Sequence, residues 1–103
     1  MKLAQPVENS ALRKNLRITC EALLDKKADD LKLLYFGKSS PLTDCFIIAT
    51  GTSHPHLKAL RNNLEKTFKD HKIELFSRER FQPSGWLVLD AIDFVVHLFS
   101  KEQ

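Results

Sequence analysis

The segment that most constrains the fold is a continuous apolar and β-prone run, Cys45–Thr50, followed directly by a glycine. A short run without polar alternation predicts a central strand covered on both faces, usually by helices. Gly51 permits a tight exit from this strand, Ser53 is a good helix N-cap, and Pro55 is tolerated in a first helical turn. A helix to about Asp70 follows, with an apolar face formed by Leu57, Leu60, Leu64 and Phe68.

The N-terminal part of the chain predicts a second helix and a short strand. From about Glu8 to Leu24 the apolar residues recur at helical spacing, at Leu12, Leu16, Cys20 and Leu23. Asn9 or Ser10 is suited to cap this helix, and the polar segment 25–30 ends it. The apolar run Leu31–Phe36 is too short for a helix and is predicted to be a strand.

The remaining connections and strands follow from turn chemistry and short apolar runs. A loop is predicted at Gly37–Pro41, a brief third strand at Ile73–Phe76 and an exposed loop at Ser77–Gly85. The chain closes with two strands, Trp86–Asp90 and Asp93–Phe99, joined by a very short connection. The order α-β-β-α-β-β-β predicts an α/β (α+β) fold, with two main helices packed on a mixed β-sheet of about five strands.

Composition limits the class of protein. A chain of 103 residues with a net charge of +3 suits one domain, 1–103, and this small charge does not by itself argue for nucleic acid. We expect no membrane partner, because no apolar run approaches the roughly 20 residues that span a bilayer, and no signal peptide is evident. Cys20 and Cys45 are predicted to be buried thiols in a reducing compartment.

The turn Gly51-Thr52-Ser53 invites a phosphate-binding interpretation, because the amide groups at a helix N-terminus favour anions. Neither P-loop nor dinucleotide spacing is present. A nucleotidyltransferase would need paired metal-binding carboxylates on the next strand, and Ile73–Phe76 supplies only Glu74. A strand exit with a helix cap is the favoured interpretation, and a nucleotide-binding or nucleotidyltransferase-like enzyme is the alternative.

Histidines near this turn are weak indications of chemistry. His54 and His56 have no neighbouring cysteine and no carboxylate four residues on, so no metal site is predicted. Ser53 and His56 have no orienting acid, so no catalytic residue is predicted, and we expect no cofactor. The basic side chains of the second helix form a solvated face or contact RNA: Lys58, Arg61, Lys66 and Lys69.

The closing hairpin carries the most informative pattern. With a connection of two or four residues, one face presents Phe99 and three opposed pairs: Trp86 with His97, Val88 with Val95, and Asp90 with Asp93. The other face is wholly apolar and is predicted to be core: Leu87, Leu89, Phe94, Val96 and Leu98. Opposed carboxylates repel each other, and a basic partner anchored on the aromatic rings would relieve that repulsion. A helix covering this face, with the acids in water, is the alternative.

Two separated groups of residues resemble the ribosomal silencing factors, the RsfS or Iojap family. The first runs from Gly37-Lys38-Ser39-Ser40 through Thr43–Ser53 to His56. The second is Trp86-x-x-x-Asp90-x-x-Asp93-x-x-Val96-His97. The resemblance covers almost the whole chain, and two motifs in the same order are far more specific than Gly-Thr-Ser alone.

This resemblance implies a non-enzymatic translation regulator with a nucleotidyltransferase-like fold that lacks the catalytic carboxylates. Such proteins bind the large ribosomal subunit through ribosomal protein L-fourteen on its intersubunit face, block subunit joining and lower translation when nutrients are short. The hairpin motif is the predicted contact with this protein, at Trp86, Asp90, Asp93 and His97. The other motif gives a possible second patch, where a structural role is an equal alternative, at Asp44, Gly51, Ser53 and His56.

The family resemblance also implies a location in the cytoplasm, or in an organelle matrix in a eukaryote. A peripheral contact with ribosomal RNA and a homodimer through the Trp86 face stay open. The chain departs from the family pattern at Tyr35 or Phe36, at Ser77–Arg80 and at Ile92, where an Asp, a Gly-x-Glu-Gly turn and a Gly are usual. It also ends at Gln103, before the family's aromatic and leucine-rich tail.

Overall fold

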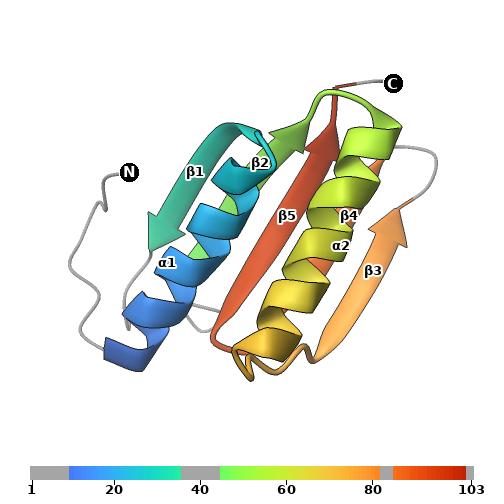
Figure 1. The fold of residues 1–103 in the computed structure, drawn as a ribbon. Helices are drawn as coiled ribbons and strands as arrows, with labels where there is room; N and C mark the ends of the chain where they lie inside the picture. Colours follow the sequence, from blue (N-terminus) through green and yellow to red (C-terminus); the bar gives the residue numbers. More distant parts are fainter. Residues whose placement is uncertain (1–9, 36–44, 82–84, 102–103) are drawn as a thin grey trace.

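The helices and strands follow one another in the predicted order. The computed structural model describes residues 10–35, 45–81 and 85–101, with the backbone alone for 77–81. The elements are α1 (Ser10–Asp25), β1 (Asp29–Tyr35), β2 (Cys45–Gly51), α2 (His54–Asp70), β3 (Ser77–Phe81), β4 (Trp86–Asp90) and β5 (Phe94–Ser100). Figure 1 shows α1 and α2 side by side on one face of the sheet.

The strands form one mixed sheet in the spatial order β1-β2-β5-β4-β3. The crossover through α2 makes β2 and β5 parallel, and the other neighbouring pairs are antiparallel. The strand β5 is therefore central, with β2 and β4 on either side. The predicted α+β class and the sheet of five strands are confirmed.

Both helices end with the same backbone device. Lys27 after α1 and Lys72 after α2 adopt left-handed conformations, with φ of 61° and 57°. The following amides then turn back: Ala28 N–H donates to the carbonyl of Leu23 at 3.0 Å, and Ile73 N–H donates to that of Phe68 at 2.7 Å. This six-to-one pattern closes each helix and directs the chain back toward the sheet. Asn9, one of the two predicted caps of α1, lies outside the described residues.

The core lies between the helices and the sheet. The predicted apolar face of α2 is buried at all four positions, and Phe68 meets Phe94 of β5 edge to face, with ring centroids 5.9 Å apart. Cys20 and Cys45 are buried thiols that form no disulfide within the described part of the chain, and the predicted burial is confirmed. Burial raises the pKa of the Cys20 thiol to about 11, which keeps it protonated and unreactive near neutral pH.

The expectation that β2 is covered on both faces is wrong. Its residues alternate between buried and half-exposed, because both helices pack against the same side of the sheet. Phe46 and Ile48 belong to the half-exposed set. The run is continuously apolar because the uncovered face of the sheet is also apolar, and sequence alone does not distinguish these two situations.

The predicted third strand is also misplaced. Residues 73–76 have no regular structure, and β3 is formed by Ser77–Phe81, which the sequence predicted to be an exposed loop. Buried Ile73 is apolar because it closes the end of α2, whereas β3 is, among the described strands, the edge strand next to β4. Charged residues are typical of edge strands. The predicted loop Gly37–Pro41 lies outside the described residues.

Candidate functional site

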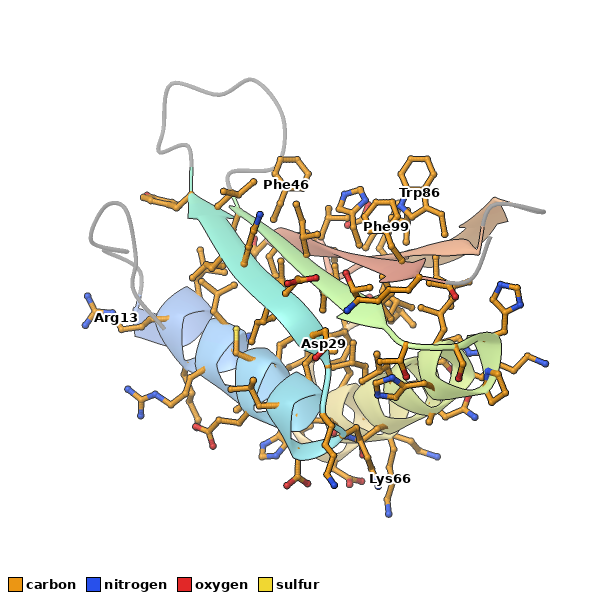
Figure 2. All side chains as sticks on the ribbon, turned by 90° about the horizontal axis from the view of Figure 1, so that it is seen from above. Arg13, Asp29, Phe46, Lys66, Trp86 and Phe99 are labelled. Atoms are coloured by element: carbon orange, nitrogen blue, oxygen red, sulfur yellow. The ribbon has the colours of Figure 1, made fainter. Side chains whose placement is uncertain are left out.

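One face of the sheet is left open by the helices. Figure 2 shows Phe46, Trp86 and Phe99 on the side of the sheet opposite to α1 and α2. We call this surface the open face and define it by half-exposed or nearly buried side chains of the three central strands: Phe46, Ile48, Trp86, Val88, Asp90, Val95, His97 and Phe99. The alternative interpretation of the sequence, in which a helix covers this face, does not hold for the described residues, because α1 and α2 both lie on the opposite side.

Four rings form the centre of the open face. The ring of Trp86 stacks on Phe99 at 5.6 Å with an interplanar angle of 13°, and on His97 at 5.8 Å with an angle of 24°. Phe46 meets His97 from the other side, with centroids 5.5 Å apart. Stacked rings gain about 0.5–1.5 kcal/mol per pair beyond the burial of area. The aromatic cluster is therefore ordered before any partner arrives.

A hydrogen bond from Trp86 determines which nitrogen of the His97 ring carries no proton. The indole Nε1–H of Trp86 donates to Nδ1 of His97 at 3.2 Å, so Nδ1 carries no proton. Partial burial also lowers the pKa of His97 below its ordinary value of 6.5. The open face is thus neutral at its centre near neutral pH.

The closing hairpin has a different register from the predicted one. Trp86 pairs with Phe99, Val88 with His97 and Asp90 with Val95, a shift of two residues. Because the side-chain period of a strand is two, this shift leaves every residue on its predicted face. The five residues predicted to be core, from Leu87 to Leu98, are all buried. The predicted pairing of Asp90 with Asp93 is wrong, since Asp93 lies in the turn.

Asp90 organises the turn. Its carboxylate Oδ1 accepts the N–H of Ile92 at 2.8 Å, and its backbone carbonyl accepts the N–H of Phe76 at 2.7 Å. Both carboxylates of the motif therefore lie at one end of the open face, Asp90 half-buried and Asp93 exposed. Asp90 and Asp93 are therefore not opposed across the hairpin, and they make this end of the open face acidic.

Two exposed apolar residues beside Asp90 were missed by the sequence analysis. The side chain of Phe76 is 71% exposed and that of Ile92 is 49% exposed. Ile92 also has a positive φ of 70°, which is costly for a β-branched residue. The departure of Ile92 from the family's usual glycine was the available signal, whereas Phe76 was hidden by its assignment to a strand. Phe46 was missed because β2 was expected to be covered on both faces.

The described residues of the second predicted patch make contacts within the protein. A Cβ at Gly51 would lie 3.0 Å from the backbone nitrogen of Leu57 and 3.1 Å from its Cα, so glycine permits the close packing of β2 against α2. Ser53 is the N-cap of α2, as predicted, and its Oγ accepts the N–H of His56 at 3.2 Å. Asp44 lies outside the described residues.

His56 connects two turns. Its Nδ1 accepts the N–H of Thr52 at 2.9 Å, so the proton is on Nε2, which donates to the carbonyl of Lys26 at 2.7 Å. This imidazole thereby ties the turn after α1 to the turn before α2. A structural role accounts for His56 without a ligand.

The turn before α2 offers few free donors to a phosphate. The amides of Thr52, His56 and Leu57 are used within the turn, and Pro55 has none. Within the described ranges, no group of three His, Cys, Asp or Glu residues is suited to hold a metal ion. No helix in the described part of the chain is long and apolar enough to cross a membrane.

The fold and the open face together define a class of protein: a small α+β domain that presents a preformed aromatic surface with an acidic end. Comparison with known proteins gives the family. The family model of the ribosomal silencing factors, described as "Ribosomal silencing factor during starvation", matches residues 9–103. The chain therefore belongs to this family, whose members regulate translation at the ribosome.

Individual relatives support the same family. The ribosomal silencing factor RsfS of Halalkalibacterium halodurans is 31% identical over 88 residues, which cover 85% of this chain and 75% of the relative. The chloroplastic protein Iojap of Arabidopsis thaliana is 33% identical over 79 residues, which cover 77% of this chain and 33% of the relative. A crystal structure from Bacillus halodurans superposes with a TM-score of 0.78 at 30% identity, covering 87% of this chain and 84% of the other.

Proposed function

We propose that this protein binds the large ribosomal subunit through ribosomal protein L-fourteen and that the open face makes the contact. The single observation that supports this most is the ordered aromatic cluster around Trp86, His97 and Phe99, uncovered by either helix. Half-exposed aromatic residues on a rigid sheet are typical of the residues that dominate binding energy in protein interfaces.

The charge distribution supports a basic protein partner. Asp90 and Asp93 lie at the turn end of the open face, where they can pair with basic side chains at the rim of an interface. Such charges mainly increase the association rate and favour the correct partner, while the aromatic centre holds the complex. Many ribosomal proteins carry the complementary basic charge because they bind RNA.

The proposed mechanism is steric. A domain seated on L-fourteen at the intersubunit face occupies space that the small subunit needs, and it thereby represses translation under nutrient limitation without catalysing a reaction. The proposal includes a peripheral contact between α2 and ribosomal RNA, and action in the cytoplasm or in an organelle matrix. Self-association through the same open face would compete with ribosome binding.

Co-sedimentation with isolated large subunits tests the proposal. Trp86→Ala should weaken binding by about 30-fold, since truncation of a central aromatic residue costs about 2 kcal/mol or more. Leu24→Ala is the matched control, because Leu24 is an exposed apolar residue on α1. Failure of the wild-type protein to sediment, or equal binding by Trp86→Ala, contradicts the proposal. A pull-down with purified L-fourteen tests the named partner.

Asp90→Asn separates charge from structure. The amide oxygen of Asn can still accept the N–H of Ile92, so the turn is preserved while the charge is removed. We expect binding to weaken several-fold, with a smaller salt dependence than in the wild type. Asp70→Asn, an exposed carboxylate on α2, is the control and should leave binding unchanged. Equal effects of the two substitutions would exclude a specific role of Asp90.

A further inference from the structure

We propose that a pocket between α2 and the start of β4 receives a backbone phosphate of RNA, beside the protein that binds the open face. The pocket has a volume of about 220 Å³. Its lining includes apolar Leu57 and Leu87, and Trp86 is shared with the open face. The inference rests on the proposed ribosomal function, because it places ribosomal RNA next to the bound ribosomal protein.

The polar lining of the pocket is basic. His54, Lys58 and Arg61 come from α2 at positions i, i+4 and i+7, which lie on one face of a helix. Among the described residues that line the pocket, none is acidic. The guanidinium of Arg61 donates to a neutral acceptor, Oδ1 of Asn62, at 3.1 and 3.3 Å, and these hydrogen bonds do not neutralise its charge.

A second groove on the same protein has acidic residues in its lining, so the basic lining distinguishes the pocket beside Trp86 from it. The groove between α1 and α2 is larger, about 410 Å³, and it is lined by Glu21, Asp25 and His71 among others. The mild net charge of +3 therefore does not make every depression of the described surface basic. The site beside Trp86 has the complementarity that a phosphate requires.

The pocket favours the backbone of RNA over a free nucleotide. The indole of Trp86 already stacks on His97 and Phe99, so the pocket offers charge rather than a vacant platform for a base. Lys58 and His54 are exposed, which suits a phosphate on a strand passing along the surface. The amides at the start of α2 are not required, because Ser53 already caps that helix.

Trp86 is the only tryptophan of the chain and lines the pocket, so its fluorescence reports binding directly. We would titrate the protein with a short single-stranded RNA, with GTP and with inorganic phosphate at several salt concentrations. RNA should change the fluorescence saturably, with an affinity that falls as salt rises. GTP and inorganic phosphate should bind at least about tenfold more weakly, because each lacks neighbouring phosphodiesters.

Two charge-matched double variants locate the site. Lys58→Glu with Arg61→Glu should weaken RNA binding by about tenfold or more and lower its salt dependence. Lys66→Glu with Lys69→Glu makes the same charge change on the same helix. Figure 2 shows Lys66 pointing away from the sheet, and Lys69 is exposed. This control should lose less than about threefold. Circular dichroism verifies that both variants fold.

The results separate this inference from the proposed function. Equal losses in the two double variants, no fluorescence response to RNA, or equally tight binding of GTP or phosphate would each overturn the RNA pocket. If the Lys58 and Arg61 variant keeps its affinity for purified L-fourteen while RNA binding is lost, the pocket is a separate site. If the wild-type protein does not bind large subunits but RNA still binds at the pocket, the proposed ribosomal function fails alone.

Discussion

The two faces of the central hairpin differ above all in whether helices cover them. On one face, the five residues from Leu87 to Leu98 are at most 6% exposed, on the side of the sheet where the helices pack. On the other face, Trp86, Val88, His97 and Phe99 are half-exposed, and neither α1 nor α2 lies over this side of the sheet. Alternate positions of the same two strands thus carry side chains with different roles. Covered residues stabilise the fold, whereas the ordered but uncovered residues are available to a partner.

The largest expected effect is a difference in stability between two phenylalanine substitutions, one on each face of the sheet. Phe94→Ala should lower the free energy of unfolding by about 3–5 kcal/mol, because it leaves a cavity against Phe68. Phe46→Ala on the open face should cost only about 1 kcal/mol, since it removes one ring contact with His97. Urea denaturation measures both. Similar losses for the two substitutions would contradict the division between the faces.

A smaller loss is expected at the buried end of β2. Gly51→Ala should destabilise by about 1–3 kcal/mol, because the new methyl group meets backbone atoms of Leu57 that cannot move independently. Thermal unfolding and large-subunit binding are measured on the same sample, below the unfolding transition. A variant with wild-type stability and impaired binding would instead favour a direct partner contact at Gly51.

A substitution at Ile92 is expected to raise stability while it weakens binding. Ile92→Gly should stabilise the protein by about 0.5–1 kcal/mol, because glycine tolerates positive φ and this gain exceeds its entropic cost. The same change should weaken ribosome binding if the exposed side chain contacts the partner. Ile92→Ala is the control that removes most of the side chain but keeps the strain. A stability loss in Ile92→Gly would show that the turn is not strained.

The smallest effect expected is a pH dependence at the centre of the open face. The folded-state pKa of His97 lies below the unfolded value of 6.5, so the unfolded chain binds the proton more readily. The contribution of His97 to stability is therefore complete above about pH 6.5 and is lost as the pH falls through the folded-state pKa. His97→Gln should reduce this slope in urea denaturation between pH 7.5 and 5. An unchanged slope would assign it to other groups.

Much of the candidate site followed from local sequence patterns. The period of two placed Trp86, Asp90 and His97 on one face even though the predicted register was wrong by two residues. The cap at Ser53 and the apolar face of α2 were also predictable, because each depends on residues within a few turns. Residue spacing did not reveal the pocket, since it joins α2 to β4 across more than 20 positions of the chain.

The sequence by itself determined the order of the elements, the alternation along each strand and the apolar faces of both helices, because these depend on propensity and period. Only the tertiary structure decided that both helices pack on the same side of the sheet. That choice turned Phe46 from an expected core residue into part of an open face, and it left Trp86 uncovered. Burial is a property of what packs above a residue, and no local pattern along the chain specifies that cover.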